Sequence, residues 1–370
     1  MSTTQPADAK SPNGQPVLAT AFPPMIDSSL SQACLSNLLI YTDDMNDQEA
    51  ISETMSQFVV KHPCRVILIL AQPRQPGARI DAELSAHTYT SASGKNAVCE
   101  QITLRACGSG VRELASAVQP LLVPDLPVYL WWRGLFLEQR ALTEQMLTFV
   151  DRFIYDGATW TNLHYTVLQV ADFIEKYHST VGFTNFNWSR LRPWRENAAN
   201  FFDVGLYEKE IWDMERVTVE FMALEGREEG FQYRALLFVA WLAVQLEWEP
   251  IRGVAGTERA QLQFQSKKGK PVDAELVQLP QSGPSAQSIQ HVIMEVMSGG
   301  KKVELSIERD HKDHVEILAI KSDAGREVLR KVPHLDSSVA NLLYRELGRR
   351  GRNRVFEKSF KMAAKILQMI

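Results

Sequence analysis

Residues 65–70 read Arg-Val-Ile-Leu-Ile-Leu, an unbroken run of aliphatic and β-branched residues that begins two positions after Pro63. Such a run is typical of a strand covered on both faces, since a strand with one solvated face alternates polar and apolar residues. On its N-terminal side, helical spacing predicts a helix at residues 47–60, which Pro63 would end, and a shorter helix at residues 32–41. Together these features indicate an α/β sheet.

Strand and helix patterns continue to alternate from this run as far as Phe202. Residues 82–88 and 98–107 alternate polar and apolar side chains, as strands with one buried face do. Alternation of this kind predicts a mainly parallel, doubly wound sheet. The further predicted elements are strands at 128–132 and 149–155, and helices at 111–118, 137–147 and 163–177.

The pattern changes in the second half of the chain. A predicted helix at residues 231–248 is followed by short alternating strands between Leu262 and Ala319, which are joined by turns rich in lysine, glycine and aspartate. This pattern predicts an antiparallel sheet meander, and two helices at 337–347 and 354–369 complete an α+β domain. The predicted organisation is a flexible tail (1–29), an α/β domain with a mainly parallel sheet (30–205) and the α+β domain (206–370).

Composition restricts the classes of partner. The chain has 370 residues, 45% of them hydrophobic, and a formal net charge of -4, so nothing global indicates nucleic acid. The most apolar stretch, residues 231–248, contains charged and amide side chains, which favours a buried helix over a membrane span. The first 29 residues lack the charged and apolar regions of a signal peptide. We therefore expect a cytoplasmic protein without a membrane partner.

The four cysteines are Cys34, Cys64, Cys99 and Cys107. They lack CxxC spacing and have no histidines placed for a metal site, so free and mostly buried thiols are favoured in a reducing compartment. The alternative is a redox switch. Cys99 and Cys107 lie in one predicted strand, where eight residues at about 3.3 Å each separate them by about 26 Å. A disulfide needs Cα atoms within about 7 Å, so these two thiols should not pair.

No catalytic constellation emerges from the motifs. The eight histidines are scattered, and neither nucleotide-binding glycine motifs nor hydrolase motifs occur, so we predict no catalytic residues, metal ligands or cofactor. Gly108-Ser109-Gly110 lies between a strand and a helix and could cradle phosphate, although a connecting turn is favoured. The arginine-rich segment 345–354 could hold a phosphate or an acidic protein surface, or could be a solvated loop.

Residues 187–195, Asn-Trp-Ser-Arg-Leu-Arg-Pro-Trp-Arg, combine two tryptophans with three arginines. Pro193 predicts a helix that starts there, preceded by a turn bearing Trp188, Arg190 and Arg192. Arginine and tryptophan are frequent anchors at protein interfaces. The alternative is that both tryptophans fill the core and the arginines are solvated. Trp132 and Arg133 follow the predicted strand 128–132, at the edge of the sheet where ligands usually gather.

Three stretches together resemble the glucose-6-phosphate dehydrogenase assembly protein family, OpcA, in its cyanobacterial form. They are His62-Pro63-Cys64-Arg65-Val66, the segment from Leu122 to Trp132, and the segment from Trp188 to Arg195. The resemblance implies a non-enzymatic partner that binds glucose-6-phosphate dehydrogenase, promotes its active oligomer and tunes its affinity for substrate. Such a partner controls how much carbon enters the oxidative pentose phosphate pathway, and in cyanobacteria it is linked to thioredoxin.

Arginines with neighbouring aromatics would supply the contacts to the dehydrogenase. The predicted contact residues are Trp132, Arg133, Trp188, Arg190, Arg192, Trp194 and Arg195, and the four cysteines are the redox candidates. Replacing Arg190 and Arg192 by alanine should abolish activation and leave the fold intact. The alternative function is a phosphosugar-binding enzyme or sensor that uses the carboxyl edge of the sheet, through Arg133 and the turn 108–110.

Overall fold

The computed structural model describes residues 34–90, 96–160, 162–203, 207–222, 233–256, 258–280, 289–349 and 351–370. The predicted flexible tail, residues 1–29, lies outside these residues. The chain forms two compact units that meet in sequence at Asp151 and Arg152. The predicted domain boundary at residue 205 stays a prediction.

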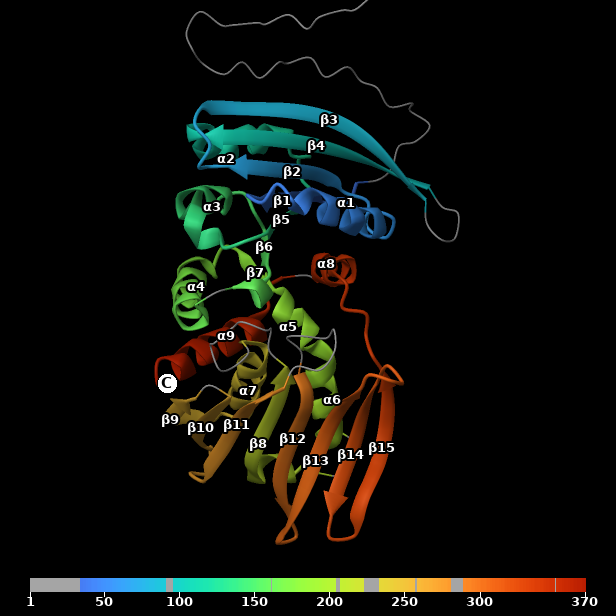
Figure 1. The fold of residues 1–370 in the computed structure, drawn as a ribbon, viewed down its shortest axis with the longest axis vertical. Helices are drawn as coiled ribbons and strands as arrows, with labels where there is room; N and C mark the ends of the chain where they lie inside the picture. The colour runs from blue at the N-terminus through green and yellow to red at the C-terminus, as the bar shows by residue number, and fades with distance from the viewer. Residues whose placement is uncertain are drawn as a thin grey trace, which may run out of the picture. The chain divides into compact units, whose positions relative to one another are not determined.

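The first unit is an α/β layer built on a mainly parallel sheet (Figure 1). Its strands lie in the order β3-β4-β2-β1-β5, and every pair is parallel except the antiparallel pair β3–β4. Helix α1 follows β1, and α2 and α3 flank β5 in sequence. The bounds are β1 Asn37–Thr42, α1 Asp47–Phe58, β2 Arg65–Gln72, β3 Ala78–Thr90, β4 Asn96–Gly108, α2 Leu114–Val118, β5 Val128–Trp132 and α3 Arg140–Met146.

The predicted helix at residues 32–41 is wrong, because residues 37–42 form the central strand β1. All six residues of β1 are buried, between β2 on one side and β5 on the other. A strand buried on both faces has no polar alternation, so its apolar residues also fit helical spacing. The predicted strand at 65–70 and the predicted helix that begins at Asp47 are confirmed.

The second unit opens with a parallel pair of short strands joined by a helix. Strand β6 (Arg152–Tyr155) pairs with β7 (Gly182–Asn185), and α4 (Leu163–Tyr177) connects them. Helix α5 (Phe186–Arg190) follows, and α6 (Arg192–Asp203) begins one residue before Pro193. The predicted turn around Trp188 is therefore a short helix, because the side chain of Asn185 accepts a hydrogen bond from the N–H of Asn187 and caps it.

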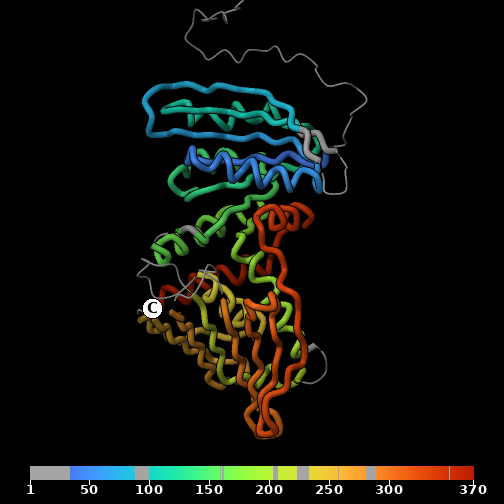
Figure 2. Tube along the Cα trace, turned by 45° about the vertical axis from the view of Figure 1, so that its right-hand side comes forward, coloured from blue at the N-terminus to red at the C-terminus, as the bar shows by residue number. Residues whose placement is uncertain are grey.

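A second sheet occupies most of the remaining chain, in the order β15-β14-β13-β12-β8-β11-β10-β9. The meander from β12 to β15, orange in Figure 2, is antiparallel throughout, whereas β8 and β11 are parallel. Helix α7 contacts β8 and β11, α6 contacts β13, and α9 packs on α7. The bounds are β8 Met214–Met222, α7 Tyr233–Gln245, β9 Glu249–Ala255, β10 Arg259–Gln265, β11 Pro271–Leu279, β12 Ile289–Ser298, β13 Lys301–Asp310, β14 Val315–Ser322, β15 Gly325–Pro333, α8 Val339–Leu347 and α9 Arg354–Leu367.

The predicted fold class, an α/β part followed by an α+β part with a mainly antiparallel sheet, is thus confirmed. Strands β8, β9 and β15 were not predicted. β9 and β15 are mostly exposed, so apolar alternation is weak there. In β8, by contrast, the buried Val217, Val219 and Phe221 alternate with polar residues. The parallel pairing of β8 with β11 depends on contacts about 60 residues apart, which local periodicity does not encode.

Candidate functional site

The first candidate site is the carboxyl end of β1 in the first unit. The strand order changes direction here, because β1 lies between β2 and β5, and ligands of open α/β sheets usually bind at this point. Arg133 follows β5 at this edge and donates to both carboxylate oxygens of Asp47, over 2.7 and 2.5 Å. Its backbone N–H also donates to the carbonyl of Tyr41. Arg133 therefore ties the end of β5 to the first turn of α1.

Carboxylates surround this edge. The carboxylate of Asp44 accepts a hydrogen bond from the N–H of Asn46 at the start of α1, so the chain itself supplies an anion where a helix would bind phosphate. Burial raises the pKa of Asp43, and the nearby Glu138 adds to the increase. For Asp47, burial opposes ionisation, but hydrogen bonds from Arg133 and Thr42 hold its pKa below the usual value. The edge is therefore acidic, and its arginine is already paired.

The glycine turn 108–110 packs against the start of β3. A Cβ on Gly108 would lie 2.1 Å from the carbonyl oxygen of Gly77, and one on Gly110 would lie 2.6 Å from that of Arg79. The N–H of Ser109 donates to the Gly77 carbonyl over 3.0 Å. These glycines are needed because two stretches of backbone pass close together, so the turn serves a packing role.

The second candidate site is the arginine and tryptophan stretch on α5 and α6. Trp188 and Trp194 are 2% and 1% exposed, so both tryptophans fill the core, as the alternative prediction has it. The other half of that alternative, solvated arginines, is wrong for Arg190 and Arg195, which are largely buried. Arg190 donates to both carboxylate oxygens of Asp156 over 2.8 Å each. Burial alone would raise the pKa of Asp156, but the hydrogen bonds and charge of Arg190 hold it below its usual value.

Buried guanidinium groups continue around this stretch. The guanidinium of Arg195 lies 3.3 Å from the centre of the Trp188 ring, and burial lowers its pKa to about 9. Its Nη1 atom has no hydrogen-bond partner among the described residues. Arg234 donates through Nε and Nη2 to the side-chain oxygen of Asn187. The stretch is therefore the centre of a buried polar network within the second unit.

Arg192 differs from the other predicted contact residues. Its side chain is 49% exposed, and within the described part of the chain its ion-pair partner is Glu196, one turn further along α6. Trp132, in contrast, is 1% exposed and stacks on Tyr41 with ring centres 3.7 Å apart. Contact of these residues with a partner stays a prediction, and the structure leaves Arg192 as the most accessible of them.

The cysteines are dispersed. Cys64 is buried, while Cys34 and Cys107 are partly exposed, and none of the three is part of a disulfide. Strand β4 runs unbroken from Asn96 to Gly108, so the straight-strand condition that separates Cys99 from Cys107 is met. The side chain of Cys99 lies outside the described residues. A redox role for these thiols stays a prediction.

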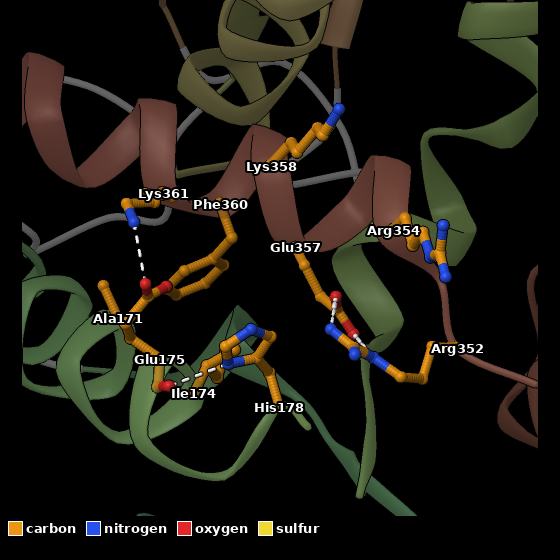
Figure 3. A pocket seen from close by; sticks show the side chains of 10 residues that line it. All are labelled: Ala171, Ile174, Glu175, His178, Arg352, Arg354, Glu357, Lys358, Phe360 and Lys361. Atoms are coloured by element: carbon orange, nitrogen blue, oxygen red, sulfur yellow. Dashed lines mark hydrogen bonds and ion pairs between the residues drawn. The ribbon is translucent and has the colours of Figure 1, made fainter. Parts of the chain in front are cut away.

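A cavity of about 270 Å³ lies between α4 and α9 in the second unit (Figure 3). Arg352 and Arg354 of the predicted basic segment line it. Arg352 is paired with Glu357 over 2.6 Å, and Lys361 with Glu175 over 2.9 Å. Figure 3 shows both ion pairs within the lining and Phe360 directed towards α4. Much of the positive charge is therefore already neutralised, which weakens the case for a phosphate site.

The described part of the chain holds neither a metal-ligand cluster nor a membrane-spanning helix. No group of histidine, cysteine and acidic side chains there is arranged to hold a metal ion. None of the helices described is both long and apolar enough to cross a membrane.

The fold combines a mainly parallel α/β sheet with a mainly antiparallel sheet, and solved structures share this arrangement. Two structures of KijD10, a 3-ketoreductase from Actinomadura kijaniata in complex with NADP and TDP-benzene, superpose with a TM-score of 0.50. They are 12% and 10% identical in sequence, covering 91% and 90% of this chain and 97% and 95% of theirs. At such identity the likeness concerns the fold alone.

The particular family follows from the sequence. The N-terminal domain of the glucose-6-phosphate dehydrogenase subunit family matches residues 56–172, and its C-terminal domain matches residues 181–360. The chain belongs to this family, OpcA, which confirms the resemblance noted from its motifs. Relatives named "Putative OxPP cycle protein OpcA" occur in Synechocystis and Synechococcus elongatus, at 25% and 24% identity. Both alignments cover 89% of this chain, and they cover 68% and 74% of the relatives.

Proposed function

We propose that this chain is a non-catalytic cytoplasmic subunit that assembles with glucose-6-phosphate dehydrogenase and activates it. It would thereby control how much carbon enters the oxidative pentose phosphate pathway. The observation that carries the non-catalytic part is the acidic edge at β1. Ligands of open α/β sheets usually bind at this edge, but here the Asp44 carboxylate binds the N–H of Asn46 just before α1, and Asp47 neutralises Arg133.

Activation requires that the chain bind the active state of the dehydrogenase better than the inactive one. The free energy that separates the two states then shifts by no more than the difference in binding free energy, typically about 1 to 3 kcal/mol. We propose Arg192 as a direct contact because it is exposed. Trp188, Trp194, Arg190 and Arg195 would support the same surface from beneath, since they hold α5 and α6 in place.

The test is to mix the chain with the cognate dehydrogenase, then to measure the mass of the complex and the dependence of rate on glucose 6-phosphate. We expect a complex heavier than either component and half-maximal rate at a lower substrate concentration. Repeating both measurements with reduced and with oxidised thioredoxin tests the redox part separately. Absence of a complex under all these conditions would contradict the proposal.

Calorimetry separates this proposal from the alternative of a phosphosugar-binding enzyme or sensor. Glucose 6-phosphate and NADP would be titrated into the chain without the dehydrogenase. We expect no micromolar binding, because the carboxylates at the β1 edge repel phosphate. Micromolar affinity for either compound would favour the alternative.

A further inference from the structure

We propose that β3 is an interaction edge at which a second copy of this chain adds its own β3 in antiparallel orientation. Strand β3 lies at the end of the strand order of its sheet and pairs only with β4 (Figure 1). It is 13 residues long. A strand in this position presents a row of N–H and C=O groups that no neighbouring strand pairs, and such a row is a template for another chain.

The other edge strands that the structure describes each carry a feature that discourages pairing. β15 has Arg326, Lys331 and Pro333, and β9 contains Pro250 near its start. β7 has only 4 residues, all buried. Lysine, proline and short length are the usual means by which edge strands avoid association. From Ala78 to Thr90 β3 has no lysine, proline or glycine, and its charged residues Arg79, Asp81 and Glu83 lie on the face opposite to Leu84, so the Leu84 face of this long edge lacks such protection.

One face of β3 is also apolar and uncovered. Ala82 lies opposite Leu104 of β4, and Leu84 lies opposite Ile102. Residues directly opposite each other in an antiparallel pair share a face of the sheet. Leu104 and Ile102 are 0% and 5% exposed, whereas Leu84 is 46% exposed. The layer that covers β4 therefore ends before β3, and an added strand would extend the apolar surface on this side.

The sequence of β3 is complementary to itself. Antiparallel pairing about a twofold axis at Leu84 places Leu84 opposite its own copy, Ala82 opposite Ala86, and Asp81 opposite His87. Glu83 then faces Ser85, so no two like charges are directly opposite. An axis at Asp81 or Glu83 would instead oppose identical carboxylates. A symmetric dimer of this kind needs a self-complementary patch, and the Leu84 register supplies one.

Sedimentation of the full chain without the dehydrogenase tests the proposal. We expect the mass to rise with concentration from that of one 41.8 kDa chain towards twice that value. Leu84→Lys would oppose two ammonium groups at the axis, and we expect it to raise the dissociation constant by about tenfold or more. Val328→Lys on β15 is the matched control, because Val328 is 47% exposed on an edge strand; it should leave the dissociation constant unchanged.

A second variant reports the register directly. In Leu84→Cys the two new thiols would face each other across the axis, within the Cα separation that a disulfide allows. Mild oxidation should therefore give a covalent dimer, while Val328→Cys and the parent chain under the same oxidant should not. A parent chain that stays monomeric at all concentrations overturns the proposal. So does a dimer that Leu84→Lys does not weaken, or a Leu84→Cys variant that crosslinks no faster than Val328→Cys. Because the dehydrogenase is absent, none of these results bears on assembly with it.

Discussion

Two arginines among the predicted contact residues, Arg133 in the first unit and Arg190 in the second, make the same kind of contact in different surroundings. Each donates to both oxygens of one aspartate, Asp47 or Asp156. The Arg133 and Asp47 side chains are each 22% exposed, and Thr42 is the other hydrogen-bond donor to Asp47. The charge of a second arginine, Arg234, also lowers the pKa of Asp156. Burial in turn lowers the pKa of Arg234 to about 9. One pair is a local clasp at a strand end, whereas the other belongs to a buried network.

The largest effect is expected for Arg190→Ala. Removing this guanidinium leaves the carboxylate of Asp156 without its two strongest hydrogen bonds in a mostly buried setting, and we expect the free energy of unfolding to fall by about 3 kcal/mol. Urea unfolding followed by circular dichroism measures it. Arg190→Lys keeps the charge but loses the planar guanidinium, so its free energy of unfolding should lie between those of Arg190→Ala and the parent chain. Equal stability of Arg190→Ala and the parent chain would show that the pair is not structural.

Arg133→Ala should cost less, about 2 kcal/mol, because Asp47 keeps its hydrogen bond from Thr42, whereas Arg190 also donates to Asn187 within the network. Exposure does not separate the two pairs, since the Arg190 and Asp156 side chains are 16% and 26% exposed. The same urea experiment measures it, preferably with Asp47→Ala and the double variant to isolate the pairwise energy. A loss larger than that of Arg190→Ala would contradict the distinction between clasp and network.

Acid should weaken both pairs. The pKa values of Asp47 and Asp156 are both lowered in the folded chain, so as pH falls below the unfolded value of about 3.9 the unfolded state takes up protons first. The two carboxylates therefore stabilise the fold above about pH 4, and this contribution is lost as pH falls through their folded pKa values. Urea unfolding at a series of pH values should show a shallower acid dependence for Asp156→Asn than for the parent chain. An unchanged slope would mean that other carboxylates dominate.

These pairs also show how far the sequence could lead. The chain pattern predicted the two kinds of sheet, and Pro193 correctly indicated a helix start, because these signals are local. The partners of the arginines are not local: Asp47 is 86 residues from Arg133, and Asp156 is 34 residues from Arg190. The local sequence around an arginine does not show whether it pairs with an aspartate of the same chain or contacts a partner protein.

The tryptophans illustrate the same limit. Trp194 follows the spacing of an amphipathic helix and Trp188 lies in the predicted turn before it, and both positions fit burial as well as they fit an interface. Their burial depends on distant elements, since Phe356 of α9 packs 5.6 Å from Trp188, and Arg309 of β13 lies 5.1 Å from Trp194. The burial of the two rings therefore depends on α9 and β13, whose positions the local sequence does not indicate.

The smallest effect on stability is expected at Arg192, and this makes Arg192 the sharpest probe of the partner surface. Its ion pair with Glu196 is about half exposed, so Arg192→Ala should change the free energy of unfolding by no more than about 0.5 kcal/mol. The double replacement of Arg190 and Arg192 cannot serve here, because loss of the Asp156 pair would weaken the fold itself. If Arg192→Ala lowers activation of the dehydrogenase at unchanged stability, the exposed start of α6 contacts the enzyme. Arg216→Ala, on the second sheet with a similarly exposed side chain (45%), is the matched control. Full activation by Arg192→Ala would show that the surface in contact with the dehydrogenase does not include Arg192.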